Sequence, residues 1–171
     1  MTDSADSTAL FDAHRDGLCR YLTRIVGQPD AARDLTQEVF LRVARAGVPA
    51  GPPEGRRAWV FRIARNLALN HLRDQQRRPA TTALVDIGRS GTQELGAAVQ
   101  QALDGLAGLD RDVFLLRETA GLGYDEIAAA CEITPDAVRS RLHRARQQLR
   151  ESLGSMISIQ LQRGVRLTQG Q

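Results

Sequence analysis

The sequence predicts an all-α protein built from two small helical domains joined by a flexible linker. Apolar residues recur at three- and four-residue spacing through most of the chain, which is the period of an amphipathic helix. Hydrophobic residues make up 42% of the 171 residues but aromatic residues only 4%, so aliphatic helices must supply the core. Residues 79–91 lack this period and are rich in Gly, Pro, Ser and Thr, as a linker would be. The predicted domains are therefore residues 8–78 and 92–153, with a C-terminal tail at 154–171.

The first domain is predicted to contain three helices. Residues 8–26 carry apolar side chains at helical spacing, and the Gly and Pro at 27–29 end this helix. Asp30 can cap a second helix that runs to residue 46. Residues 47–55 hold too many Pro and Gly residues for a helix and form a loop. A third helix spans residues 56–73.

The second helix carries an apolar residue on its polar face. Leu41 lies there among Asp34, Gln37 and Glu38. An apolar side chain ringed by carboxylates and an amide indicates a docking surface for a basic partner. A single exposed leucine is also compatible with an ordinary surface, and composition alone does not separate the two interpretations.

The third helix is apolar almost all the way round, so it must pack on several sides. Its polar stripe consists of Arg62, Asn66 and Arg73, with Arg65 and Asn70 beside it. Residues 56–78 contain seven Arg against one acidic residue, which predicts a nucleic-acid contact surface.

The second domain begins with predicted helices at 92–106 and 110–120, with Leu109 and Asp110 as the cap between them. Two further helices joined by a tight turn follow at residues 124–150. Thr134 offers an N-cap oxygen, and Pro135 takes the first helical position, where its missing N–H is tolerated. The buried stripe of the last helix consists of Val138, Leu142, Ala145 and Leu149.

The outer face of this last helix is basic. Ser140 and His143 lie opposite the buried stripe, flanked by Arg139 and Arg144. Five arginines between 139 and 150 have no acidic residue among them, whereas a merely solvated helix usually carries Glu four residues before Arg. This arrangement predicts a helix-turn-helix whose second helix enters the DNA major groove, with an ordinary helical hairpin as the alternative.

Composition excludes several other classes of protein. No apolar run approaches the length of a membrane span and no signal-peptide pattern is present, so we expect a cytoplasmic protein without membrane insertion. Cys19 and Cys131 have no ligand spacing and are expected to be small buried side chains rather than a redox pair. The tail fits either a strand or a helix, and we expect a frayed extension, with a partner-binding segment as the alternative. The scattered His14, His71 and His143 do not form a catalytic or metal site, so we expect no enzyme, metal or cofactor.

Three blocks of sequence resemble a bacterial RNA polymerase sigma factor of the extracytoplasmic-function (ECF) type, sigma-70 family group IV. They are D-L-T-Q-E-V-F-L-R at 34–42, R-A-W-V-F-R-I-A-R-N-L-A-L-N-H-L-R at 57–73, and Y-D-E-I-A with A-V-R-S-R-L-H-R-A-R between 124 and 146. The resemblance covers about residues 8–153, and the order and spacing of the blocks make it specific.

The resemblance implies that residues 8–78 are sigma domain 2 and residues 92–153 sigma domain 4. It implies binding to core RNA polymerase, through the β′ clamp and the β flap, to promoter DNA and to an anti-sigma factor. The implied polymerase-binding residues are Asp34, Gln37, Glu38 and Leu41. The implied contacts to the melted −10 element are Arg62, Asn66, Asn70 and Arg73, and those to the duplex −35 element are Arg139, Ser140, His143 and Arg144.

Two positions and one loop depart from the family pattern. Glu132 stands in the turn of the helix-turn-helix, where Gly is common, and a left-handed backbone there would cost about 1 kcal/mol. Gly123 replaces the usual Ser or Thr cap before Tyr124, and the loop at 47–55 has no aromatic residue to help hold a flipped base.

Two other functions fit the sequence less well. A stand-alone helix-turn-helix transcriptional regulator would leave the 34–42 surface and the basic third helix unexplained, and it would bind duplex DNA without polymerase. An anti-sigma factor would more often show a zinc motif or a membrane span, and the sequence has neither.

Overall fold

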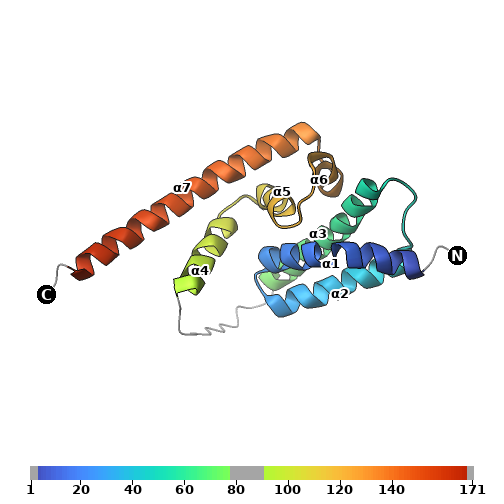
Figure 1. Ribbon diagram of the computed structural model, residues 1–171, viewed down its shortest axis with the longest axis horizontal. Helices are drawn as coiled ribbons and strands as arrows, with labels where there is room; N and C mark the ends of the chain where they lie inside the picture. Colours follow the sequence, from blue (N-terminus) through green and yellow to red (C-terminus); the bar gives the residue numbers. More distant parts are fainter. Residues whose placement is uncertain (1–3, 78–90, 169–171) are drawn as a thin grey trace.

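Two neighbouring helical bundles make up the structure, a computed structural model that describes residues 4–77 and 91–168. The first bundle contains α1 (Ser4–Val26), α2 (Pro29–Ala46) and α3 (Pro53–Arg77). The second contains α4 (Gly91–Asp104), α5 (Gly108–Glu118), α6 (Tyr124–Cys131) and α7 (Pro135–Thr168). No strand occurs within these described ranges, so the predicted all-α class is confirmed (Figure 1).

The start of α2 differs from the prediction. Pro29 rather than Asp30 opens the helix, and the residue at the N-cap is Gln28, which makes no side-chain cap. Asp30 instead pairs with Arg33 on the surface, at 3.3 Å. The predicted loop at 47–55 is also shorter, because Pro53 already starts α3. A proline in the first helical turn loses no hydrogen bond, so it can start both helices.

Two elements of the second bundle also differ from the prediction. The helix α5 begins at Gly108 with Ala107 at its N-cap, so Asp110 is not a cap but a buried residue of the first turn. The C-terminal tail is not frayed along its whole length, since α7 continues as a helix through Thr168. The C-terminal part of α7 extends past α4 on the left of Figure 1.

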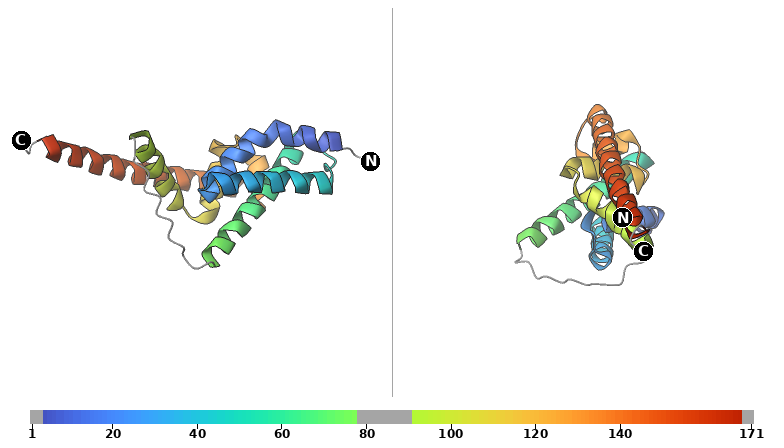
Figure 2. Two further views of the ribbon diagram at one scale, coloured as in Figure 1. Left: turned by 90° about the horizontal axis from the view of Figure 1, so that it is seen from below. Right: turned by 90° about the vertical axis from the view of Figure 1, so that its left-hand side faces the viewer.

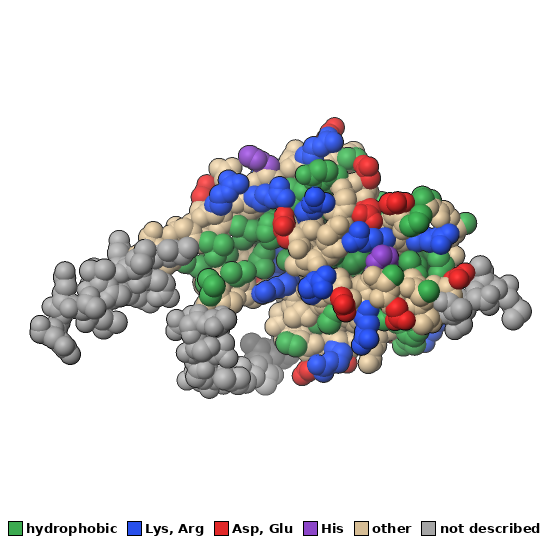
Figure 3. Space-filling model, viewed as in Figure 1, with side chains coloured by type: hydrophobic (Ala, Val, Ile, Leu, Met, Phe, Trp, Pro, Cys, Tyr) green, Lys and Arg blue, Asp and Glu red, His purple; other side chains and the backbone are tan. Residues whose placement is uncertain are grey.

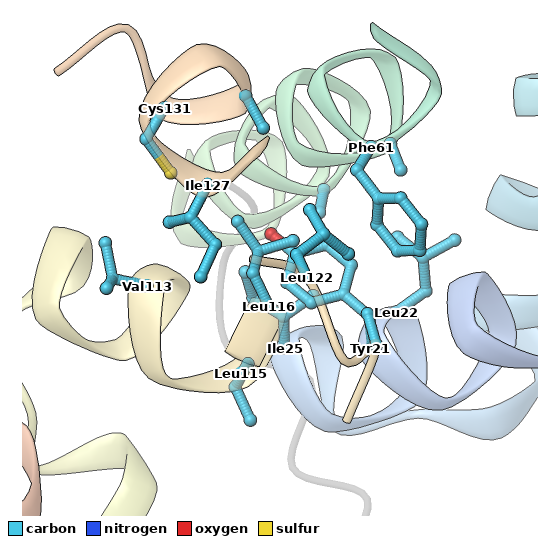
Figure 4. Close-up of a cluster of buried hydrophobic side chains, with 14 of the residues drawn as sticks. Tyr21, Leu22, Ile25, Phe61, Val113, Leu115, Leu116, Leu122, Ile127 and Cys131 are labelled. Atoms are coloured by element: carbon cyan, nitrogen blue, oxygen red, sulfur yellow. The ribbon is translucent and has the colours of Figure 1, made fainter. Parts of the chain in front are cut away.

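A single hydrophobic core runs through both bundles. The helix α3 packs on α6, and α1 packs on α5. Figure 4 shows Tyr21 and Phe61 from the first bundle beside Leu116, Leu122 and Ile127 from the second. The predicted linker lies outside the described residues except for Gly91, so the contact between the bundles comes from their own side chains.

Polar contacts accompany this shared core. Arg65 of α3 and Asp112 of α5 form an ion pair at 2.8 Å, with side chains 15% and 3% exposed. Arg57 of α3 donates to the carbonyl oxygen of Ala120 and lies 3.4 Å from the carboxylate of Glu126. Burial raises the pKa of the Asp112 carboxyl above its ordinary value, although Arg65 and Arg111 oppose this shift.

The C-terminal end of α1 is closed by a side chain from the second bundle. Arg111 Nη2 donates to the carbonyl oxygens of Arg24 and Ile25, each at 3.0 Å. The last carbonyl groups of a helix lack partners within the helix, so this arginine satisfies acceptors that would otherwise need solvent. By contrast, the C-terminal half of α3 projects from the molecule in both views of Figure 2.

The two cysteines have different surroundings. Cys131 is buried as predicted, and burial raises the pKa of its thiol to about 12. A thiol with so high a pKa carries almost no thiolate at neutral pH, which makes it a poor nucleophile. Cys19 is exposed, so its predicted burial was wrong. The two cysteines do not pair.

Candidate nucleic-acid and partner-binding surfaces

Local contacts cap α6 and shape the turn that leads from it into α7. The carboxylate of Glu126 accepts a hydrogen bond from the backbone N–H of Gly123, at 2.6 Å, which is one half of a capping box at the start of α6. Gly123 has no side chain to supply the other half. Thr134 Oγ1 accepts from the N–H of Ala137, at 3.2 Å, which confirms the predicted N-cap. Between them Glu132 has φ 58° and ψ 45°, a left-handed conformation. The left-handed Glu132 and the Thr134 cap therefore shape the turn from which α7 begins.

Replacing Glu132 with glycine should stabilise the protein. Glycine adopts the left-handed conformation without the clash of a β-carbon, a gain of about 1 kcal/mol. The change also removes a 4.0 Å contact between Glu132 and Arg62, an exposed pair that contributes at most about 1 kcal/mol and, at this distance, much less. We expect the unfolding temperature of Glu132→Gly to rise by about 2–4 °C in a thermal melt.

Glu132→Ala is the matched control, because it removes the same carboxylate and keeps the β-carbon. Its unfolding temperature should stay within about 1–2 °C of the original. Equal stabilisation by both substitutions would show that the carboxylate, and not the backbone conformation, is the destabilising feature.

The outer face of α7 presents the side chains that the sequence predicts. Val138, Leu142, Ala145 and Leu149 are buried, which confirms the predicted stripe. Arg139, Ser140, His143 and Arg144 are all exposed on the remaining surface. Arginine side chains gather over the N-terminal half of α7 in Figure 3. This face therefore offers hydrogen-bond donors that none of the other described helices covers.

Three of the α7 arginines, Arg141, Arg144 and Arg146, have carboxylate partners on α5. Asp110 of α5 binds Arg141 Nη1 at 2.7 Å, and it accepts from both Nε and Nη2 of Arg144 at 3.2 Å. Glu118 of α5 binds Arg146 at 2.8 Å. These arginines are therefore paired although residues 139–150 contain no acidic residue. Their partners lie 28 to 34 residues away in the sequence, where local spacing could not reveal them.

Asp110 is the most buried of these carboxylates, with its side chain 8% exposed. Burial alone would raise its pKa, but hydrogen bonds and charge from Arg144 and Arg141 outweigh burial and lower the pKa below the ordinary value. The hydrogen bond to Asp110, followed by the charge of Asp110, raises the pKa of Arg144 in turn. Asp110 therefore remains ionised beneath α7 at neutral pH.

An aromatic ring stands beside Arg139. The guanidinium carbons of Arg117 and Arg139 lie 5.4 Å and 5.8 Å from the centre of the Tyr124 ring. Both distances fall within the range of cation–π contacts. Arg139 also pairs with Asp136 one turn earlier, at 2.6 Å, where both side chains are well exposed.

The polar stripe of α3 is only partly free. Asn66, Asn70 and Arg73 are exposed, and Arg73 Nη1 donates to Asn70 Oδ1 at 3.2 Å. Arg62 is partly covered and lies near Glu132 of the helix-turn-helix. Arg65, which the sequence places beside this stripe, turns away to Asp112 in the bundle interface.

The α2 surface has the exposed leucine that the sequence predicts. Leu41 is 43% exposed, and Asp34 and Gln37 are exposed with it. Glu38 is partly buried and accepts a hydrogen bond from Arg42 Nε at 2.8 Å. The group therefore combines an apolar side chain with two carboxylates and an amide.

Comparison with known proteins identifies the family to which the chain belongs. The sigma-70 region 2 family matches residues 10–78, and the sigma-70 region 4 family matches residues 96–149. The ECF RNA polymerase sigma factor SigE of Mycolicibacterium smegmatis is 34% identical over 89% of this chain and 69% of its own length. The RNA polymerase sigma factor CarQ of Myxococcus xanthus is 32% identical over 86% of this chain and 88% of its own. The chain belongs to the ECF sigma factors.

This ECF sigma factor is shorter than some of its relatives. It covers 57% of the length of the probable ECF sigma factor SigI of Mycobacterium tuberculosis, which is 30% identical. Among solved structures, CnrH in complex with the cytosolic domain of CnrY superposes with a TM-score of 0.71 at 23% identity, over 90% of both chains. RpoE in complex with the anti-sigma factor NepR, from Bartonella quintana, gives a TM-score of 0.62 at 21% identity over 88% of this chain and 95% of that chain. These structures share the fold.

The three candidate surfaces of the sigma factor lie on α2, α3 and α7 and do not merge into one pocket. The α3 stripe approaches the helix-turn-helix at Arg62, which lies 4.0 Å from Glu132 in the turn before α7. Across the described part of the chain no group of His, Cys, Asp and Glu residues could hold a metal ion, and none of its helices is long and apolar enough to cross a membrane. The contacts of Arg57, Arg65 and Asp112 between bundles were not predicted, because no local pattern marks a pair that is distant in sequence.

Proposed function

We propose that this sigma factor binds core RNA polymerase through α2 and directs it to promoters whose −10 and −35 elements are read by α3 and α7. The exposed outer face of α7 is the observation that carries this proposal. Arg139, Ser140, His143 and Arg144 project there from the second helix of a helix-turn-helix, the helix that enters the major groove in such motifs. As an initiation factor it acts on the chromosome, and we place its action in the cytoplasm.

The α2 surface is the proposed polymerase contact. Asp34, Gln37 and Glu38 surround Leu41, so the surface can pair with a basic partner and bury one apolar side chain. We propose that the β′ clamp takes this surface and that the β flap contacts residues 92–153.

The α3 stripe is the proposed contact to the melted −10 strand. Asn66 and Asn70 carry amides that can accept and donate to the edge of an unpaired base, and Arg62 and Arg73 can hold its phosphates. A partner of the anti-sigma type is also expected, and the complexes of CnrH and of the Bartonella RpoE support it by analogy of fold.

Run-off transcription with core polymerase and a panel of promoter variants tests the proposal. We expect transcription that depends on the added sigma factor and on the base sequence of both elements. A stand-alone regulator would instead bind duplex DNA tightly without polymerase and would not confer promoter-dependent initiation on the core enzyme.

Asn66→Ala should impair promoter melting. The substitution removes one side chain that can hydrogen-bond an unpaired base, so we expect open-complex formation on duplex promoters to fall roughly three- to tenfold. The loss of open-complex yield on a template with a pre-melted bubble should be smaller, because the base pairs of the bubble are already open. The measurement is open-complex yield on both templates.

Gln101→Ala is the control, since it removes an exposed amide from α4, away from α3. It should leave both templates unaffected. An equal loss for Asn66→Ala on duplex and bubble templates would assign Asn66 to backbone contact and remove it from melting.

A further inference from the structure

A buried carboxylate under the proposed reading helix controls one of its arginines. Asp110 lies in the first turn of α5 and is almost inaccessible, whereas Arg144 on α7 is 58% exposed. Asp110 Oδ2 accepts from Arg144 Nε, and Asp110 Oδ1 accepts from Arg144 Nη2, both at 3.2 Å. Two parallel hydrogen bonds fix the plane of the guanidinium as well as its position.

We propose that Asp110 is a positioning residue for −35 recognition, which holds Arg144 in the orientation that reads a guanine. This inference rests on the proposed role of α7. A guanidinium has five N–H donors, and Asp110 uses two of them along the Nε–Nη2 edge. The three that are left include the Nη1–Nη2 edge, which is directed away from Asp110. That edge is a two-donor fork matching O6 and N7 of guanine.

A second arginine keeps Asp110 from cancelling the charge of Arg144. Arg141 Nη1 binds the same carboxylate at 2.7 Å and is itself mostly buried. The three side chains together carry a net charge of +1, so Arg144 still attracts DNA. Fixing a long side chain before binding lowers the entropy lost when the contact forms.

Arg139 contacts the Tyr124 ring but has no buried carboxylate partner among the described residues. Its partner Asp136 is on the same helix, and the two side chains are 63% and 89% exposed. An exposed ion pair of this kind is weak and screened by salt. The difference in burial between Asp110 and Asp136 therefore assigns the fixed orientation to Arg144.

The test compares Asp110→Asn with Asp136→Asn in the full-length sigma factor assembled with core polymerase. Each substitution removes one negative charge beside a reading arginine. Both should steepen the dependence of promoter binding on salt, by up to about one unit of log–log slope. Only Asp110→Asn should also reduce the preference for the correct base, by about tenfold at a single −35 base pair. Binding to a full panel of −35 variants at fixed salt gives this preference.

The panel separates the possible failures. An unchanged base preference in Asp110→Asn overturns the inference and leaves the proposed function standing. A uniform change across all −35 sequences also overturns it, because Arg144 would then contact phosphate. A wild-type holoenzyme without any −35 preference overturns the proposed −35 reading, and the inference with it.

A second variant covers the case in which Asp110→Asn does not fold, which a thermal melt reveals. Arg144→Lys keeps the positive charge but lacks the two-nitrogen fork. It should lose preference at the same base pair by a similar factor. Retained preference in Arg144→Lys overturns the inference. Where Asp110→Asn does fold, adding it to Arg144→Ala should produce no further loss of preference.

Discussion

Replacing Arg65 with alanine is expected to reduce the free energy of unfolding by about 3–5 kcal/mol, because it leaves the carboxylate of Asp112 buried without its ion-pair partner. The pair spans 2.8 Å between α3 and α5, and Asp112 is 3% exposed. Water cannot replace the lost arginine without opening the contact between the bundles. Urea unfolding followed by circular dichroism measures the loss.

Arg62→Ala is the matched control on the same helix. Its contact to Glu132 is 4.0 Å long and exposed, so we expect a loss below about 1 kcal/mol. Replacing Arg65 with Met and Asp112 with Leu together should restore most of the stability, since apolar side chains of similar size avoid the buried charge. A loss below about 1 kcal/mol for Arg65→Ala would contradict burial of the pair in solution.

The effect of Arg65→Ala should depend on pH in a defined direction. Burial raises the pKa of Asp112, with Arg65 as the main opposing influence. A carboxyl whose pKa is raised by folding favours the folded state below its ordinary value near 3.8, and this contribution is lost as the pH rises through the folded value. Removing Arg65 raises the pKa further. The difference in stability between Arg65→Ala and wild type should therefore be smaller near pH 4 than at pH 7.

Replacing Glu38 and Leu41 together with alanine should reduce association with core polymerase by about 100-fold or more. A 100-fold loss corresponds to about 2.8 kcal/mol, which is within the range lost when one hot-spot residue of an interface is truncated. Leu41 is 43% exposed and supports little of the core, so the fold should survive. Association can be measured by titrating core enzyme with labelled sigma factor.

Asp30→Ala controls for loss of a surface ion pair, because Asp30 pairs with Arg33 on the same helix. It should bind core enzyme normally. Normal binding by a well-folded Glu38 and Leu41 double variant would remove α2 from the proposed polymerase contact.

The sequence predicted those features that follow from a repeating local pattern. The buried stripe of α7 and the exposure of Leu41 are confirmed, because helix period alone decides which side of a helix a residue occupies. Thr134 caps α7 as predicted, since capping depends on residues a few positions apart.

The errors and omissions arise where tertiary packing decides. Cys19 is exposed although its apolar neighbours indicate burial, because no other helix covers that position. Asp110 looks like a helix cap in sequence, yet its carboxylate binds arginines that follow more than 30 residues later. Arg65 lies beside the α3 stripe that is proposed to bind DNA, but it pairs with Asp112 in the interface between the bundles. Only the packed structure shows which partner an arginine takes.

The shared core of the two bundles sets a limit on promoter binding. The −10 and −35 positions lie 25 base pairs apart, which is about 85 Å of B-form DNA. In the packed arrangement α3 and the helix-turn-helix meet at the contact between Arg62 and Glu132. Measured along the helix axes from this contact, the proposed reading residues of α3 and α7 all lie within about 18 Å. If both elements are read at once, the bundles must separate and expose Tyr21, Phe61 and Ile127 to water. The measured affinity then equals the affinity of the open form multiplied by its population, so a form present at about 1% would bind about 100-fold more weakly than its contacts allow.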